Sequence, residues 1–360
     1  MDKLKVSIII PCRNEEAFIH ECITSVLAFN DPDNIVHEIC VIDGMSTDNT
    51  KKIITEFFLS NPRIKLLNNP GIRQASALNI GIRKSTGNYI LRLDAHAVYP
   101  KNYLYLCQQT AVRTDADNVG GIVIPKARNN HYCANLVQAL TTHKFGVGNS
   151  GFRTGMKAGS ADTVPYGFFK KSIFDTIGFF DERLVRAQDY EFNRRLIKSG
   201  GTVWLNPEIQ VAYYNQPTFW LFIKKQLFHE APYNAYMWYL APYTFAYRHA
   251  VTGVFFLGIL TGSILSFYFN WLKWSFFVVI ALYLALAIIS SIQQAFRYKN
   301  IIHLITLPVS FFLFHFFHGL GLVLGIINLL LGRSPVQLHT EPWEGAGRIR
   351  AFQADVSLDV

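Results

Sequence analysis

The stretch GNYILRLDAHA, residues 87–97, decides both the fold and the chemistry expected of this chain. Its apolar run predicts a buried strand, Tyr89–Leu93, which ends at two polar side chains, Asp94 and His96. Side chains two apart on an extended segment point to the same face, so both can meet one ligand. A carboxylate paired with an imidazole suits Mn²⁺ better than Mg²⁺, which prefers an all-oxygen shell. The residues alone leave open whether they hold a metal against a phosphate or form a solvated loop.

Around this stretch, short β-branched runs alternate with helical stretches from Val6 to about Gly201, which predicts βαβ units and an α/β fold with a mostly parallel sheet. Ligands of such sheets bind at the carboxyl ends of the strands, where CRNEE, DGMSTD and DAHA fall, so we expect one shared site. The predicted strands are Val6–Ile10, Glu38–Ile42, Ile64–Leu67, Tyr89–Leu93 and Asn118–Ile124. The predicted helices are Glu15–Phe29, Thr47–Ser60, Gln74–Ser85 and Lys101–Thr114.

The amino-acid composition of the chain limits the classes of ligand that it is expected to bind. Charged residues make up 16% of the 360 residues, well below the roughly 25% of ordinary soluble domains, and residues 250–331 hold very few of them. The net charge of +9 fits a lipid surface, a diphosphate substrate or nucleic acid, but no block of lysine and arginine supports nucleic acid. No GxGxxG or GxxxxGK[ST] motif follows a strand, which disfavours a dinucleotide fold and a P-loop.

The cysteines and the N-terminal segment indicate a cytosolic first half. The five cysteines form no CxxC pair, so we expect buried, reduced thiols: Cys12, Cys22, Cys40, Cys107 and Cys133. The apolar run near the start is too short for a signal-peptide core, so we expect that the amino-terminal domain is not exported.

The C-terminal third reads as a membrane region. Residues 219–249 are aromatic and mildly basic, like an interfacial segment, and 250–269 and 275–292 are uncharged tracts long enough to span a bilayer. A third uncharged tract, 301–331, contains Pro308 and predicts either one long tilted helix or two shorter segments; a polar tail, 332–360, follows. Basic residues place 1–218 and the turn after 292 in the cytoplasm, which predicts a multi-pass protein of the inner (plasma) membrane.

Two further acids carry candidate chemistry. Asp43 follows a buried strand, with Ser46 or Thr47 expected to cap the next helix; Asp43 lies too early for the cap and can accept from a base or ribose. Asp189 lies near the start of an amphipathic helix within 179–201, where an acid either favours the helix dipole or serves as a general base.

The order of VSIIIPCRNEE, a DG-S-TD-T loop, LNIGIRKSTGNYILRLDAHA, and FDE followed by QDYEFNRRL resembles the family 2 inverting glycosyltransferases of GT-A fold over about residues 5–230. PCRNEE, RLDAHAVYP, DTVPYGFFKK and HFFHGLG resemble the succinoglycan-type, membrane-anchored exopolysaccharide transferases. The resemblance implies a mixed, mostly parallel sheet flanked by helices, followed by transmembrane helices.

The resemblance also implies transfer from a nucleotide-diphospho-sugar, most often a UDP-sugar, with the help of Mn²⁺ or Mg²⁺. Asp189 matches the catalytic base, Asp43 the acid that holds the nucleobase, and Asp94 the first aspartate of the DxD motif, with His96 as second metal ligand. The donor-binding set is Pro11, Arg13, Asn14, Glu15, Asp43, Arg73 and Asp94; the acceptor-side set is Gln188, Tyr166 and Gly167. The expected acceptor is a saccharide linked to polyprenyl diphosphate in the lipid bilayer.

The chain departs from the family pattern at several positions. Gly44 replaces the second acid of the DDGS loop, Arg13 the tyrosine of PxYNE, His96 the last DxD acid and Gln188 the glutamate of the ED pair. The stretch from Gln226, QLFHE, replaces the QxxRW of processive synthases, which disfavours that activity. A polyprenyl-phosphate sugar synthase and a non-catalytic scaffold stay as alternatives. The loop 146–155 reads either as an acceptor-side lid or as a linker.

Overall fold

The computed structural model describes residues 4–148, 150–155 and 157–338. The chain divides into two compact units. The sheet unit comprises the described residues up to Ile124 and Gly155–Ala212, and the helical unit comprises Pro125–Thr154 and Tyr213–Leu338.

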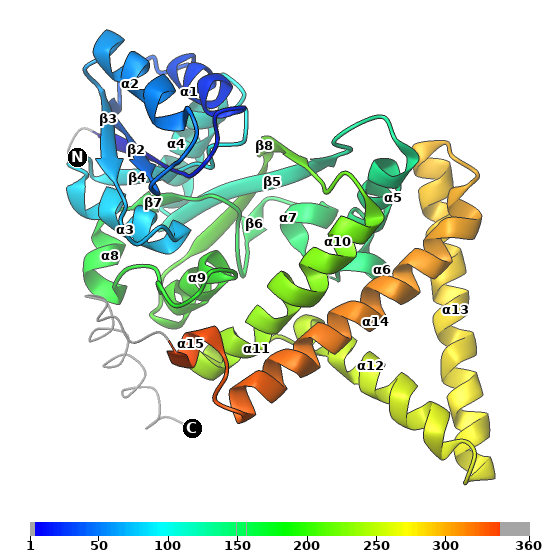
Figure 1. Cartoon of the computed structure of the whole chain (residues 1–360). Coiled ribbons are helices and arrows are strands. Elements are labelled where there is room, and N and C mark those ends of the chain that lie inside the picture. Colours follow the sequence, from blue (N-terminus) through cyan, green and yellow to red (C-terminus); the bar gives the residue numbers. More distant parts are fainter. Residues whose placement is uncertain (1–3, 149, 156, 339–360) are drawn as a thin grey trace. The chain divides into compact units, whose positions relative to one another are not determined.

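An eight-stranded sheet with the order β3-β2-β1-β4-β7-β5-β8-β6 forms the centre of the sheet unit (Figure 1). β1 pairs in parallel with β2 and β4, and β2 with β3, whereas β7 runs antiparallel to both β4 and β5. The predicted mixed sheet is therefore confirmed. The strands are β1 Val6–Cys12, β2 Val36–Asp43, β3 Ile64–Asn68, β4 Tyr89–Arg92, β5 Asn118–Lys126, β6 Gly159–Ser160, β7 Phe168–Lys170 and β8 Val203–Tyr214.

Helices cover this sheet so completely that every residue of β1 is buried. The close approach of α3 depends on Gly81, because a Cβ there would lie 2.7 Å from Cγ2 of Ile9 on β1. The helices of the unit are α1 Ile19–Leu27, α2 Thr50–Ser60, α3 Gln74–Lys84, α4 Tyr103–Thr114, α8 Ser172–Ile177 and α9 Gln188–Lys198. The four predicted helices are present, but the first two begin three or four residues later than expected.

The helical unit contains α14, a single helix that continues through Pro308. The third apolar tract is thus one long helix rather than two segments. Its elements are α5 Tyr132–Thr141, α6 Lys144–Val147, α7 Gly151–Thr154, α10 Phe219–Lys225, the π-helical turn η1 Gln226–Glu230, α11 Ala231–Leu240, the 3-10 turn η2 Pro242–Thr244, α12 Tyr247–Leu265, α13 Asn270–Tyr298, α14 His303–Leu330 and α15 Pro335–Leu338. The loop 146–155 thus begins in α6 and ends in α7.

Glycines let the helices of this unit pack closely around α14. A Cβ at Gly319 would lie 2.0 Å from the carbonyl oxygen of Thr252, and one at Gly321 would lie 2.4 Å from that of Leu227. Small residues at helix contacts are typical of membrane bundles. The HFFHGLG segment of α14 therefore packs closely against α12 and η1.

Three helices of the described chain are long and apolar enough to cross a membrane: Tyr247–Leu265, Asn270–Tyr298 and the segment His303–Leu338 (Figure 1). Many large apolar side chains of α12 and α13 are exposed, which fits a lipid environment better than water. The predicted tail, 332–360, lies outside the described residues from 339 onward.

The cysteines follow the expectation at four of five positions. Cys12, Cys22, Cys40 and Cys107 are free and buried, and burial raises the pKa of each thiol. Cys133 is exposed, so the prediction of burial is wrong for it. Its place in the first turn of α5 leaves the side chain outside the core of the helical unit.

Candidate active site

The loops after β1 and β2 are joined by hydrogen bonds. Asn14 donates its backbone N–H to Oγ of Ser46 over 2.9 Å, and its side-chain oxygen accepts from the N–H of Thr47, also over 2.9 Å. Ser46 and Thr47 are therefore engaged across the loops and do not cap a helix, so the predicted cap is wrong. Helix α2 begins at Thr50, whose N–H donates to the carboxylate of Asp48. The two loops thus form one rigid rim.

Asp43 ends β2 and is buried beneath this rim. Its two carboxylate oxygens accept from the N–H of Ser46 at 3.3 and 3.2 Å. Gly44 follows in a crowded place, where a Cβ would lie 3.2 Å from the carbonyl oxygen of Ile72 and 3.3 Å from that of Cys12. The glycine that replaces the usual acid is therefore matched to its surroundings.

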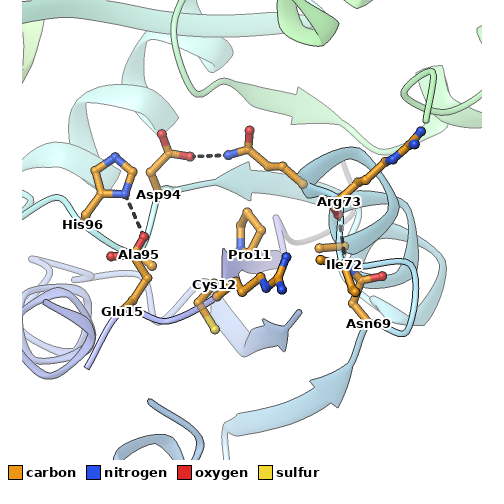
Figure 2. A pocket seen from close by; sticks show the side chains of 12 residues that line it. Pro11, Cys12, Glu15, Asn69, Ile72, Arg73, Asp94, Ala95 and His96 are labelled. Carbon is orange, nitrogen blue, oxygen red and sulfur yellow. Dashed lines mark hydrogen bonds and ion pairs between the residues drawn. The ribbon is translucent and has the colours of Figure 1, made fainter. Parts of the chain in front are cut away.

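A pocket opens at the carboxyl ends of the central strands (Figure 2). Asp94, His96 and Glu15 lie at one end of it, and Asn69, Ile72 and Arg73 lie at the other. Six predicted residues line this pocket: Pro11, Arg13, Glu15, Arg73, Asp94 and His96. Six others do not line it and lie elsewhere in the same unit: Asn14, Asp43, Tyr166, Gly167, Gln188 and Asp189.

Asp94 is held at both its backbone and its side chain. The hydroxyl of Tyr99 accepts from the N–H of Asp94 at 2.7 Å and donates to its carbonyl oxygen at 3.2 Å. Its carboxylate Oδ1 accepts from Nη2 of Arg92 at 3.0 Å and from the amide of Gln74 at 3.1 Å. The side chain is 18% exposed, so it faces the pocket from a fixed position.

His96 lies at the rim, with its side chain 52% exposed. Its Nδ1 lies 3.1 Å from a carboxylate oxygen of Glu15, and Figure 2 shows the two side chains turned toward each other. Among the described residues, no group of three or more His, Cys, Asp or Glu side chains is placed to hold a metal ion. Asp94 and His96 still fit a divalent cation that takes most of its ligands from phosphate and water, as Mg²⁺ commonly does at phosphate sites.

Asp189 lies in the first turn of α9. Its Oδ2 accepts from Nη1 of Arg92 at 2.6 Å, while Oδ1 is buried without a hydrogen-bond partner among the described residues. Burial raises the pKa of Asp189, the guanidinium of Arg92 opposes that rise, and the carboxylate of Asp94 adds to it. A carboxylate with a raised pKa and one unsatisfied oxygen is suited to accept a proton.

The predicted acceptor-side residues lie behind these acids. Gln188 donates its side-chain amide to Oε1 of Gln74 at 2.7 Å, which links α9 to α3. The carbonyl oxygen of Gly167 accepts from the backbone N–H of Arg92 at 3.0 Å. Tyr166 is buried, with its ring 5.7 Å from the guanidinium carbon of Arg92. In this structure, these three residues contact Gln74 and Arg92, the two side chains that hold the carboxylate of Asp94.

Sequence reasoning missed Arg92, Gln74 and Ile72. Arg92 is 4% exposed and bridges Asp94 and Asp189. The available signal was a single arginine at the end of an otherwise apolar strand, because a buried charge is almost always paired. Gln74 begins a predicted helix and Ile72 precedes it, so neither carried a signal.

Backbone strain gathers in the loops around the site. Ile72 has φ of 61°, a left-handed conformation that β-branched residues rarely adopt. Four other positive-φ residues lie in the loops that lead to the site or its supporting residues: Asn14, Met45, Tyr166 and Ala187. Residues held in such conformations cluster at functional sites.

Comparisons with known proteins find one family model and two relatives that cover much of the chain. Residues 7–176 match the family model described as Glycosyl transferase family 2. The chain is 29% identical to the succinoglycan biosynthesis protein ExoA of Rhizobium meliloti over 219 residues, which is 59% of this chain and 65% of that protein. It is 28% identical over 339 residues, 90% of this chain and 97% of the relative, to the dolichyl N-acetyl-alpha-D-glucosaminyl phosphate 3-beta-D-2,3-diacetamido-2,3-dideoxy-beta-D-glucuronosyltransferase of Methanococcus voltae.

One solved structure supports the fold. The mannosyltransferase PcManGT from Pyrobaculum calidifontis, in complex with GDP-Man and Mn²⁺, matches with a TM-score of 0.55 at 16% identity over 91% of this chain and 87% of that chain. At this identity the likeness concerns the fold alone.

Proposed function

We propose that this chain, a glycosyltransferase whose residues 7–176 belong to glycosyl transferase family 2, adds one sugar from a nucleotide-diphospho-sugar to a lipid-linked saccharide, with inversion. The family assignment makes the chain an enzyme and sets aside the non-catalytic scaffold. The GT-A fold predicted from the sequence is confirmed by the family match, the mixed sheet and the structural neighbour. The observation that carries the proposal is the pair of carboxylates, Asp94 and Asp189, held on one buried guanidinium beside a pocket.

The donor is proposed to lie in the pocket at the ends of β1 and β4. The rim formed by the loops after β1 and β2 and the acid Asp43 would receive the nucleoside, as the resemblance implies. Arg13 lines the pocket and is suited to meet phosphate or to stack on the base. The neighbour with GDP-Man supports a nucleotide sugar of some kind, and a UDP-sugar is our expectation.

A divalent cation is proposed to be held by Asp94 and His96. Metal dependence is typical of the family, and the neighbour PcManGT contains Mn²⁺. When bound, the cation supplies charge neutralisation for the leaving diphosphate. The protein contributes one carboxylate, whose position Arg92 and Gln74 fix, and one exposed imidazole that is oriented by Glu15.

The general base is proposed to be Asp189. Its Oδ2 is anchored by Arg92, so Oδ1, which is buried without a hydrogen-bond partner among the described residues, is the oxygen that we assign to accept the proton of the acceptor hydroxyl. As Asp189 takes that proton, the acceptor oxygen attacks the anomeric carbon on the face opposite the diphosphate. The bond from this carbon to the diphosphate breaks in line with the attack, which inverts the anomeric centre. General-base catalysis contributes about 10²–10⁴-fold to a rate.

The acceptor is proposed to be a saccharide on a polyprenyl diphosphate. Two observations support a lipid carrier: three helices long and apolar enough to span a membrane, and a relative over 90% of the chain whose name describes transfer to a dolichyl-phosphate-linked sugar. We place the catalytic domain, 1–218, on the cytoplasmic side of the inner membrane, with 219–249 at the interface and 250–331 as the anchor. The product would belong to a cell-surface polysaccharide or glycoconjugate.

The test incubates membranes that contain the full chain with labelled UDP-, GDP- and dTDP-sugars, a lipid-linked saccharide and Mn²⁺ or Mg²⁺. We expect transfer by the wild type and a loss of about 10²–10⁴-fold in kcat for Asp189→Asn. The matched control is Asp115→Asn, an exposed aspartate in the left-handed conformation that asparagine tolerates.

Two results would count against the proposal. Unchanged turnover in Asp189→Asn excludes Asp189 as the base. Transfer to polyprenyl phosphate itself, retained in Asp189→Asn, identifies a polyprenyl-phosphate sugar synthase, because a phosphate acceptor needs no general base.

A further inference from the structure

Arg92 occupies a position unlike that of any predicted site residue. It is the last residue of β4, and its backbone N–H donates to the carbonyl oxygen of Gly167, which precedes β7. Its guanidinium is almost wholly buried, at 4% exposure. Nη2 donates to Asp94 in the loop after the same strand, and Nη1 donates to Asp189 at the start of α9. One side chain therefore joins two acids that are 95 positions apart in the sequence.

We infer that Arg92 is a positioning residue, which fixes the carboxylates of Asp94 and Asp189 relative to each other so that donor and acceptor are aligned for transfer. This inference rests on the proposed function, because it assigns the two acids to the donor and the acceptor. The guanidinium itself contacts neither the substrate nor the cation in this account.

The shape of the guanidinium makes it suited to this task. Its N–H groups form a planar, rigid fork, so two neighbouring nitrogens that hold two carboxylates also fix their spacing and orientation. The ammonium group of a lysine is a point charge on a flexible stem and fixes neither. Charge alone would neutralise the acids, but it would not orient them.

The hydrogen bonds also determine which oxygens remain for chemistry. Arg92 and Gln74 both occupy Oδ1 of Asp94, and Arg92 occupies Oδ2 of Asp189. Oδ1 of Asp189 is buried and has no partner among the described residues. Each acid is therefore anchored through one named oxygen, so that its other oxygen has a defined direction.

The surroundings hold Arg92 itself in place. The ring of Tyr166 lies 5.7 Å from its guanidinium carbon, and both Tyr166 and Gly167 adopt positive φ, at 63° and 109°. A Cβ at Gly167 would lie 2.4 Å from the ring of Phe169 on β7, so this turn requires glycine. The turn before β7 thus contacts the buried arginine, which gives the sequence PYG of 165–167 a role in aligning Asp94 and Asp189.

The experiment compares Arg92→Lys with the matched control Arg113→Lys, an exposed arginine in the last turn of α4. For the full chain we measure kcat and donor KM, donor binding by calorimetry with Mn²⁺, and the thermal midpoint to confirm folding. We expect kcat of Arg92→Lys to fall about 10²-fold, since small misplacements of reacting groups cost this much. Donor KM and donor Kd should change much less than kcat, because Gln74 still holds Asp94 and the pocket rim is unchanged.

A double variant distinguishes a role of Arg92 in aligning the acids from a role in stabilising the fold. Arg92 acts through Asp189, so Arg92→Lys combined with Asp189→Asn should lose little more kcat than Asp189→Asn alone. A merely structural role predicts additive losses, together with a lower thermal midpoint in each variant.

Wild-type kcat in folded Arg92→Lys would overturn the inference, as would a loss confined to donor KM. The same assays are repeated without a saccharide acceptor, so that water takes its place and the rate of donor hydrolysis measures the activity of the site. If the wild type transfers sugar to a different acceptor but Arg92→Lys still loses kcat, the proposed function fails while the inference stands. If the wild type behaves as proposed and Arg92→Lys is unaffected, the inference alone fails.

Discussion

Replacing Glu38 with glutamine should lower the stability of the sheet unit in a pH-dependent way and leave donor binding unchanged. Glu38 is buried near the start of β2 and accepts hydrogen bonds on both oxygens. Oε1 accepts from Ser7 on β1 at 2.6 Å and from the N–H of Thr86, just before β4, at 2.6 Å. Oε2 forms an ion pair with Lys65 on β3. One carboxylate therefore joins the four parallel strands at the end of the sheet opposite the site.

The size of the effect follows from the pKa of this group. Burial alone would raise it, but hydrogen bonds from Lys65, Ser7 and Thr86 outweigh burial and lower the pKa of Glu38 from 4.5 to about 2. A difference of roughly 2.5 pH units corresponds to about 3 kcal/mol in the free energy of unfolding. Because the pKa is lower in the folded state, this stabilisation is present above pH 4.5 and is lost as the pH falls toward 2.

The assay is the thermal midpoint of the full chain in detergent at several pH values, for Glu38→Gln and for the exposed control Glu56→Gln. At about 2–4 °C per kcal/mol for a domain of this size class, Glu38→Gln should unfold roughly 6–12 °C below the wild type at pH 7. The gap should narrow below pH 4.5, since protonated glutamate and glutamine are both neutral. Donor KM should be unchanged, because Asp43 and the pocket lie at the other end of β2.

A gap that stays constant from pH 7 to pH 3 would refute the electrostatic reasoning. So would a loss no larger than that of Glu56→Gln, because a carboxylate bound by Ser7, Thr86 and Lys65 would then contribute nothing measurable.

Two further predictions concern the pocket. His96→Asp should raise the activity supported by Mg²⁺ relative to that supported by Mn²⁺, since a carboxylate completes the oxygen shell that Mg²⁺ prefers; an unchanged ratio would show that His96 does not bind the cation. Ile72→Asn should raise the thermal midpoint by the equivalent of about 1–2 kcal/mol, because asparagine tolerates the φ of 61° at this exposed position; an unchanged or lower midpoint would contradict the strain argument.

The fold was largely predictable because its parallel strands are short apolar runs between amphipathic helices. All five predicted strands are present, and each of the four helices is found with shifts only at its ends. The errors concern the starts of α1 and α2, where Asn14 and Ser46 bond across loops that are 32 positions apart. The strands β6, β7 and β8 were not predicted; β6 and β7 have only two and three residues and carry no periodic signal, whereas β8 was missed although it has 12 residues.

The site was predictable only as a set of strand-end acids. Local patterns place Asp43 and Asp94 at the ends of buried strands, but they do not contain the partners of these residues. Arg92 lies two positions before Asp94 in the sequence, whereas its second partner, Asp189, is 97 positions away. Which acids share a guanidinium depends on how α9 packs against the sheet, and no local pattern records that.

The departures from the family pattern are better explained as a rebuilt site than as a decayed one. Gly44 stands where a Cβ would crowd two carbonyl oxygens, so the missing acid matches a tight contact between loops. Gln188 donates to Gln74, which in turn donates to Asp94, so its amide extends the hydrogen-bond network that orients Asp94, the acid proposed to face the donor. His96 meets Glu15 at 3.1 Å. A domain that had lost its activity would be expected to lose such contacts, since nothing would maintain them. Each of these three departures has a defined partner or a steric reason in or beside the pocket.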